Sequence, residues 1–254
     1  MKIEIDITKN AQENANLYYE KAKKLRKKAE GIRNSIKKLE EKINEINKEA
    51  SKIEVKKIRK KEWYEKFNWF FTSNNMLAIG GRNANENEII NKKYFLENDL
   101  AFHANVFGAS LVILKNGLNA DYSIKEEVAQ FAACYSKAWE DKQYAIDVYA
   151  LKREQVSKST QEGYLAKGSF LLKGEREWFR NLKLELYIGL DKEHDRIKIL
   201  PSLTYNKIND KDMIHIVPGK TEKSQFAKLI ANRLGFDDID YIIQHLPPGY
   251  FSIV

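Results

Sequence analysis

The sequence is poor in the residues that build disulfide-bonded and zinc-binding folds. Its 254 residues include one cysteine, Cys134, and four histidines. A single cysteine cannot form an intramolecular disulfide, and the histidines do not have the spacing of zinc ligands. These absences exclude a secreted disulfide scaffold and a zinc finger, and we expect neither a metal nor a cofactor.

Long apolar runs are missing as well. The longest, residues 100–114, has about 15 residues and contains His103, Asn105 and Ser110, so it is shorter than the ~20 residues that span a bilayer. The first ten residues contain two carboxylates and no apolar segment, which excludes a signal peptide. We therefore expect a soluble, cytoplasmic protein without a membrane partner.

Sequence motifs of catalysis and nucleotide binding are also absent. Residues 80–82, Gly-Gly-Arg, follow an expected strand but lack the spacing of a phosphate-binding glycine loop. There is no G-x-S-x-G nucleophile motif and no H-x-x-x-H pair. Cys134 falls on the apolar face of an expected helix, which favours a packed core thiol over a nucleophile. We expect a binding protein with no catalytic residues, not an enzyme.

A heptad pattern occupies the first quarter of the sequence. Apolar residues recur at alternating spacings of four and three from Tyr18 to Ile53, and alanines continue the pattern back to Ala11. This 3.5-residue repeat is typical of a coiled-coil seam. It predicts a helix of about 65 Å over residues 11–53. Thr8 or Asn10 is expected to cap its first turn.

The seam of this helix requires a partner helix. A second copy of the chain, a fold-back of residues 51–62, or a helix outside this sequence would supply one. The fold-back segment is too short to cover the whole seam. The second copy and the external helix therefore remain as the main alternatives.

Positive charge is concentrated on this arm. Residues 1–62 contain 19 Lys and Arg against 11 Asp and Glu, whereas residues 63–254 contain 25 of each, so the net charge of +8 belongs to the arm. No carboxylate interrupts residues 21–28, and a nucleic-acid phosphate backbone would neutralise the cations there. A solvated coiled-coil face is the alternative. The cations in question are Lys21, Lys23, Lys24, Arg26, Lys27 and Lys28.

From residue 63 onward, short apolar runs and regular glycines replace the heptads. Residues 1–62 are therefore expected to be a coiled-coil arm, and residues 63–254 an α/β (α+β) domain with a mixed β-sheet. Helices are expected over residues 128–141, with one buried face, and 225–234, which Gly235 ends. Strands are expected over residues 76–80, 100–103, 110–114, 145–151, 168–172, 182–188, 196–200 and 213–217.

Two features of the domain suggest contacts with RNA. Residues 61–71 contain six aromatics, which we expect to anchor the core, with base stacking as the alternative. Basic residues beside glycine turns are typical of surfaces that contact phosphate, and solvated loops are the alternative for them. These basic residues are Lys152, Arg153, Lys158, Lys173 and Arg176.

Short motifs of the domain, in their order along the chain, resemble the NFACT-R domain. This domain belongs to a family of ribosome-associated quality control factors that includes fibronectin-binding protein A and nuclear export mediator factor. Residues 14–24 also resemble the start of the second coiled-coil arm of that family. The matching runs are residues 61–73, 79–84 with 87–88, 99–110, 131–139, 155–158, 168–170, 217–219 and 246–249.

The resemblance implies an RNA-binding module of a ribosome-associated quality control factor. Its implied partners are the large ribosomal subunit with stalled peptidyl-tRNA, and tRNA or rRNA, during rescue and C-terminal tailing of the nascent chain. Arg82 and His103, in the family motifs, become further candidates for RNA contact. A coiled-coil interaction scaffold without direct RNA contact is the alternative function.

The resemblance also bears on what surrounds the chain. Full-length members place an N-terminal domain, a helix–hairpin–helix region and a first coiled-coil arm before this segment. The chain thus resembles a C-terminal half, whose seam would pair with that first arm. It departs from the family pattern at Asn105 and Phe107, which replace an acid and a second histidine, and at Asn83, which replaces an aspartate.

The open seam predicts self-association when no other helix is present. We expect the isolated chain to dimerise in light scattering, or to bind the missing half of the protein, because an apolar heptad stripe is stable only when it is covered. A monomer that keeps a folded arm would contradict dimerisation.

Overall fold

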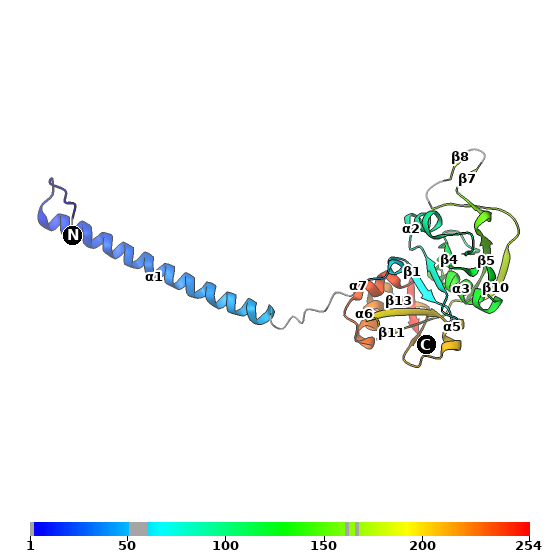
Figure 1. The fold of residues 1–254 in the computed structure, drawn as a ribbon. Helices are drawn as coiled ribbons and strands as arrows, with labels where there is room; N and C mark the ends of the chain where they lie inside the picture. The colour runs from blue at the N-terminus through cyan, green and yellow to red at the C-terminus, as the bar shows by residue number, and fades with distance from the viewer. Residues whose placement is uncertain (1–2, 51–59, 161–162, 166–167) are drawn as a thin grey trace. The chain divides into compact units, whose positions relative to one another are not determined.

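The computed structural model describes residues 3–50, 60–160, 163–165 and 168–254. It separates into two compact units, residues 1–58 and 59–254 (Figure 1). The arm–domain boundary expected at residues 62 and 63 stays a prediction. Within the described ranges, no helix is both long enough and apolar enough to cross a membrane.

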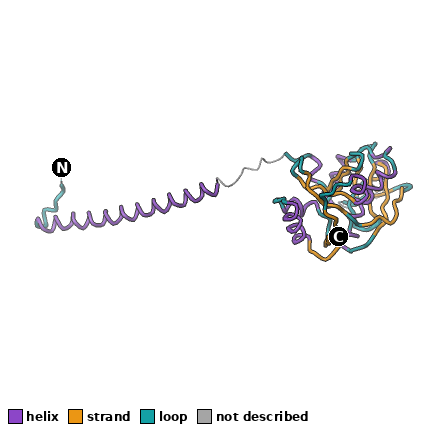
Figure 2. Tube along the Cα trace, turned by 90° about the horizontal axis from the view of Figure 1, so that it is seen from below, coloured by secondary structure: helices purple, strands orange, loops and turns teal. Residues whose placement is uncertain are grey.

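The described residues of the arm form one helix, α1 (Ala11–Ala50), which is continuous in Figure 2. Asn10 caps it, as expected: its Oδ1 accepts a hydrogen bond from the N–H of Glu13 at 2.8 Å. The Glu13 carboxylate accepts the N–H of Asn10 at 3.0 Å, which completes a reciprocal capping box. The helix end expected at Ile53 and most of the possible fold-back segment lie outside the described residues.

The heptad stripe of α1 is exposed. Leu25, Leu39 and Ile43 expose 58%, 59% and 55% of their surface. In the part of the arm that the structure describes, no second helix covers these side chains. The stripe is therefore available to a partner.

The described residues of the domain form two main antiparallel sheets and two small strand pairs, and the expected α/β (α+β) class is confirmed. Every strand pair within the described residues is antiparallel. The larger sheet has, in order, β1 (Asn68–Phe71), β2 (Leu77–Gly80), β4 (Val112–Leu114), β3 (Leu100–Ala104), β5 (Ala145–Lys152) and β10 (Glu177–Lys183). The smaller has β12 (Arg196–Pro201), β11 (Leu186–Asp191), β13 (Ile214–Glu222) and β14 (Tyr250–Ile253).

Shorter elements complete the domain. Two small strand pairs are β6 (Val156–Ser157) with β9 (Leu171–Leu172) and β7 (Ser159–Thr160) with β8 (Gly163–Tyr164). The α-helices are α2 (Ala84–Ile89), α3 (Tyr122–Cys134), α4 (Lys137–Glu140), α5 (Ser202–Ile208), α6 (Lys223–Leu234) and α7 (Ile239–His245). Three short 3₁₀ helices are η1 (Trp63–Lys66), η3 (Gly117–Asn119) and η4 (Arg153–Gln155), and η2 (Ile90–Tyr94) is a π-helix.

Both faces of the larger sheet are buried. On β5, Val148 and Ala150 belong to the core that contains α3, whereas Tyr149 and Leu151 belong to a second cluster on the other face. This alternation follows the two-residue period of a strand. It explains why these strands appear in the sequence as short, nearly continuous apolar runs.

Helix α3 lies at the centre of the main core. It contacts β3, β5 and β10 of the larger sheet, and also β12 and α5. Its residues 127–134 are all buried, so the single buried face expected for residues 128–141 is wrong. A helix with neighbours on opposite sides is buried on all sides.

Three sequence-based boundaries are also corrected or confirmed. The helix expected to continue to residue 141 breaks at Ser136, whose Oγ accepts the Ala138 N–H at 3.2 Å and starts α4. The strand expected over residues 182–188 is instead two strands, β10 and β11, which belong to different sheets. The end of α6 at Gly235 is confirmed, with φ at +65°.

A buried carboxylate joins α3 to its neighbours. Glu127 is fully buried, and its oxygens accept hydrogen bonds from the N–H of Ser73 at 2.8 Å and from Thr204 Oγ1 at 2.9 Å. The Lys207 ammonium lies 2.7 Å from Oε1. The turn between β1 and β2 and helix α5 are thereby fastened to α3.

Replacing this carboxylate is expected to destabilise the domain. Glu127→Gln substitutes an amide N–H₂ for an acceptor oxygen and should lower the free energy of unfolding by about 2–3 kcal/mol in urea titration. The matched control is Glu126→Gln, on the same helix and only partly buried. It should change stability by less than about 0.5 kcal/mol. Equal effects of the two substitutions would contradict this role of Glu127.

Candidate functional site

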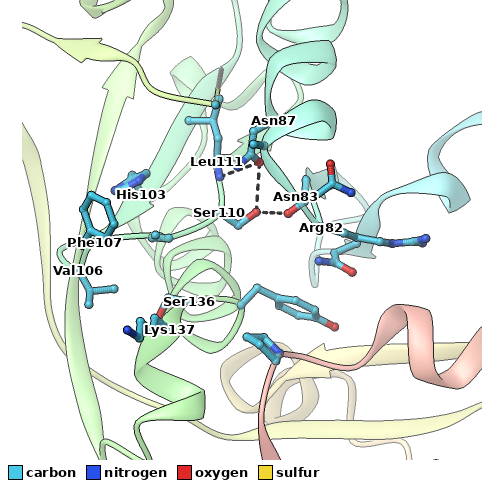
Figure 3. Close-up of a pocket in the computed structure, with 18 of the residues that line it drawn as sticks. Arg82, Asn83, Asn87, His103, Val106, Phe107, Ser110, Leu111, Ser136 and Lys137 are labelled. Atoms are coloured by element: carbon cyan, nitrogen blue, oxygen red, sulfur yellow. Dashed lines mark hydrogen bonds between the residues drawn. The ribbon is translucent and has the colours of Figure 1, made fainter. Parts of the chain in front are cut away.

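A pocket of about 810 Å³ is hollowed into the domain (Figure 3). Its size lies within the roughly 300–1,000 Å³ range of ligand pockets. Segments far apart in the sequence line it, and most of them belong to the runs that resemble the NFACT-R domain. These segments are residues 81–84, 106–111, 135–137, 168–170 and 244–248.

One wall is built around the side chain of Asn87. Its Oδ1 accepts the N–H of Leu111 at 3.2 Å and lies 3.5 Å from Ser110 Oγ, which itself donates to the Gly81 carbonyl. A Cβ on Gly81 would lie 2.2 Å from Asn87 Oδ1, so only glycine fits there. Asn87 thus joins the loop after β2 to the loop before β4.

Arg82 forms the next part of the wall. Its Nη2 donates to the carbonyl oxygens of Glu65 at 2.9 Å and Phe67 at 3.0 Å. The same nitrogen lies 3.1 Å from His245 Nε2. Burial is the main cause that lowers the pKa of Arg82 from its usual value. Much of this guanidinium is therefore used to hold the fold.

His245 is adapted to this position as a neutral ring. Its Nδ1–H donates to the Tyr241 carbonyl at 2.7 Å, which leaves Nε2 to accept from Arg82. Burial, with the charge of Arg82 in addition, lowers the pKa of His245 to about 4. A neutral acceptor avoids a second positive charge beside the guanidinium.

The pocket lining has more positive than negative charge. It includes Arg82, Lys137 and Lys223 but one carboxylate, Glu140. Lys223 Nζ donates to the Leu246 carbonyl at 2.8 Å, and burial lowers its pKa to about 8. At neutral pH the ammonium remains mostly charged, so the lining favours an anionic ligand.

His103 also lines the pocket, and a tyrosine links it to a second candidate. Its Nδ1 lies 3.2 Å from the Tyr149 hydroxyl, and burial lowers its pKa. The Arg176 guanidinium lies over the Tyr149 ring, 4.4 Å from the ring centre. The structure therefore brings His103 and Arg176 into one cluster, although Arg176 is outside the pocket lining.

The remaining basic candidates of the domain lie outside the pocket lining. Arg153 donates to the Val156 carbonyl at 3.0 Å, and Lys158 lies 3.7 Å from the Glu88 carboxylate, so both have structural contacts. The exposed Lys152 and Lys173 are held together through Gln155. Its side chain accepts the Lys152 N–H at 2.8 Å, and its carbonyl accepts the Lys173 N–H at 2.9 Å.

The arm candidates are exposed on α1. Residues 21–28 are all exposed, and no ion pair is found for their cations within the described part of the arm. They remain accessible to an anionic partner. The cations are Lys21, Lys23, Lys24, Arg26, Lys27 and Lys28.

Sequence reasoning missed two pocket cations, Lys137 and Lys223. Lys137 belongs to a motif run, so a signal for it was present. Lys223 starts α6 and reaches the pocket only through tertiary folding, so the sequence pattern carried no signal for it.

The residues that the structure describes contain no cluster of His, Cys, Asp and Glu able to hold a metal. Cys134 is fully buried, and burial raises the pKa of its thiol.

The neutral His245 predicts acid sensitivity. Between about pH 6.5 and 4, the His245 ring is protonated in the unfolded chain but neutral in the folded chain. The free energy of unfolding therefore decreases as the pH falls through this window. The loss should approach about 3 kcal/mol. In urea titrations, His245→Asn should lose the part of this slope that His245 contributes, while the part from His103, whose pKa burial also lowers, remains. His194→Asn, at an exposed histidine, should keep the full slope, and an unchanged slope in His245→Asn would contradict the assignment.

Comparisons with known proteins agree with the motif runs. Residues 66–174 match the family model described as NFACT protein RNA binding domain. The chain is 42% identical over 218 residues to the archaeal Rqc2 homolog aRqcH of Methanocaldococcus jannaschii, covering 83% of this chain and 32% of that protein. It is 36% identical over 176 residues to ribosome quality control complex subunit NEMF of Homo sapiens, covering 66% and 16%.

These matches also define the extent of the relationship. The chain spans about a third or less of the length of these two relatives. A solved structure of the C-terminal part of the fibronectin/fibrinogen-binding protein from Streptococcus suis aligns with 21% identity and a TM-score of 0.41, covering 71% of this chain and 78% of that one. The family model and the sequence identities together show that this chain belongs to the NFACT family.

Proposed function

We propose that the chain is the RNA-binding module of a ribosome-associated quality control factor. It binds the large ribosomal subunit and tRNA in the cytoplasm while stalled ribosomes are rescued and nascent chains receive C-terminal tails. The module binds and does not catalyse. One observation carries the proposal: segments that resemble the RNA-binding domain converge on a single pocket whose lining has a positive charge excess.

Phosphate contacts on the domain are assigned to a few exposed cations. Lys152 and Lys173 suit this role because Gln155 fixes their backbones while their side chains are exposed. Residues 63–254 have no net charge, so attraction from a distance comes from residues 21–28 of the arm. In this division, the arm attracts RNA without specificity and the pocket supplies recognition.

A second candidate function is a coiled-coil interaction scaffold. The exposed stripe of α1 favours it, because apolar side chains such as Leu39 and Ile43 are half or more exposed. A partner helix on this stripe, from a first arm or a second copy, is compatible with RNA binding. The scaffold replaces the RNA-binding proposal only if the chain shows no affinity for RNA.

The proposal predicts a salt-dependent affinity for tRNA. The logarithm of the association constant should fall linearly with the logarithm of salt concentration, with a slope of about −0.7 to −0.9 per phosphate neutralised. The double variant Lys152→Gln/Lys173→Gln removes two phosphate contacts, so the slope of this plot should become less negative by about 1.4 to 1.8. Fluorescence anisotropy with labelled tRNA measures both effects.

A matched control for this titration is Lys192→Gln, in the turn between β11 and β12. Lys192 is exposed and pairs with Asp212 at 3.3 Å, so it should contribute no phosphate contact. Affinity that does not respond to salt would reject the RNA-binding proposal. The same loss in Lys192→Gln as in the double variant would reject the assigned lysines.

A further inference from the structure

The most exposed aromatic side chain at the pocket is Phe107, in the loop between β3 and β4. It exposes 94% of its surface although it lines the pocket. Gly108 follows it with φ at +76°, a conformation that favours glycine and turns the chain at this point. Such a phenyl ring gains nothing from folding, because it remains in water. Its flat faces are free to stack on another ring.

Two residues of the pocket lining have buried polar atoms that lack a hydrogen-bond partner among the described residues. Asn68 exposes only 5% of its surface, and its Oδ1 has no hydrogen-bond partner among the described residues. The Nε of Arg82 is also buried and lacks a partner there. Both residues line the pocket, and Arg82 donates to the carbonyl of Phe67, the residue before Asn68. An acceptor and a donor thus lie on neighbouring parts of one wall.

A buried polar atom without a hydrogen-bond partner destabilises the folded state. Neither Asn68 Oδ1 nor Arg82 Nε is open to solvent in the unbound chain, so a ligand reaches them only when the Asn68 and Arg82 side chains shift toward the pocket. A ligand that offers both a donor and an acceptor then satisfies both. The edge of a nucleobase does so, because each base carries adjacent hydrogen-bond donors and acceptors. Figure 3 places Phe107 and Arg82 on opposite sides of the hollow, with Lys137 on the side of Phe107.

This inference rests on the RNA-binding proposal and specifies the ligand of the pocket. We propose that the pocket binds unpaired RNA, with one base stacked on Phe107 and a neighbouring base hydrogen-bonded by Asn68 and Arg82. Lys137 and Lys223 neutralise the phosphates between them. Paired bases cannot do this, because their faces are stacked and their Watson–Crick edges are occupied.

The test uses the complete 254-residue chain and fluorescence anisotropy. The probes are labelled single strands of A, C or U, each about ten nucleotides long, and a blunt RNA duplex of equal length. We expect tighter binding to at least one single strand than to the duplex. Phe107→Ala should weaken single-strand binding roughly 5- to 150-fold, and Phe107→Trp should retain it.

The matched control is Tyr144→Ala, an aromatic residue that is 71% exposed and absent from the pocket lining. It should leave the affinity unchanged. The second test variant, Asn68→Leu, has nearly the same shape and removes the unpartnered acceptor. It should weaken single-strand binding at least about threefold while leaving the urea midpoint equal or higher, a combination that a purely structural role would not produce.

The outcomes separate this inference from the proposed function. A wild-type chain that binds neither probe class would overturn both. Wild-type binding to RNA that Phe107→Ala leaves unchanged, or a preference for the duplex, would overturn the pocket assignment alone. Equal losses in Phe107→Ala and Tyr144→Ala would also overturn it, even if Asn68→Leu failed to fold.

Discussion

The insertion of the Arg82 guanidinium between backbone carbonyls is the interaction on which the rest of the domain depends. It joins the turn η1, the loop after β2 and helix α7, three segments that the chain order keeps far apart. Nη2 lies within hydrogen-bond distance of the carbonyl oxygens of Glu65 and Phe67 and of Nε2 of His245, so these neighbours have little freedom. Burial lowers the pKa of both His245 and Lys223, and the charge of Arg82 lowers both further. Arg82 also forms part of the pocket wall.

Arm and domain obey different physical constraints. The arm is a regular helix whose charge and apolar stripe are both exposed, so it can attract a polyanion and a partner helix from different faces. The domain has balanced charge and a closed core, and its polarity is local. In the proposed function, attraction and selectivity are therefore assigned to separate parts of the chain, because phosphate contacts position a ligand and base contacts specify it.

Repeating patterns made part of the fold predictable from sequence. The heptads predicted α1, and apolar runs predicted β2, β3, β5 and β12 within one or two residues, because these signals are local. The short elements β1, α5, α7 and β14 were missed because they are too brief to repeat a period. Residues 182–188 were assigned to one strand because apolar alternation continues across the turn that separates the two sheets.

The candidate site was less accessible to sequence reasoning. Arg82 and His103 were identified through motif resemblance, and both line the pocket. Lys223 was not, because it reaches the pocket only through contacts with residues that are distant in the sequence. Asn68 was not singled out either, although it belongs to the motif run of residues 61–73. In the sequence, Phe107 indicated only the loss of a polar group from the family motif. The structure adds that its ring is exposed at the pocket, where it can stack on a ligand.

The burial of Cys134 has a practical consequence. The only thiol of the chain lies on the central helix, without solvent exposure and with a raised pKa, so alkylating reagents cannot reach it in the native state. Its rate of modification therefore reports the opening of the core itself, without any engineered label. A cysteine introduced at the surface would be the one that reacts, so spectroscopic labels can be attached to the native background.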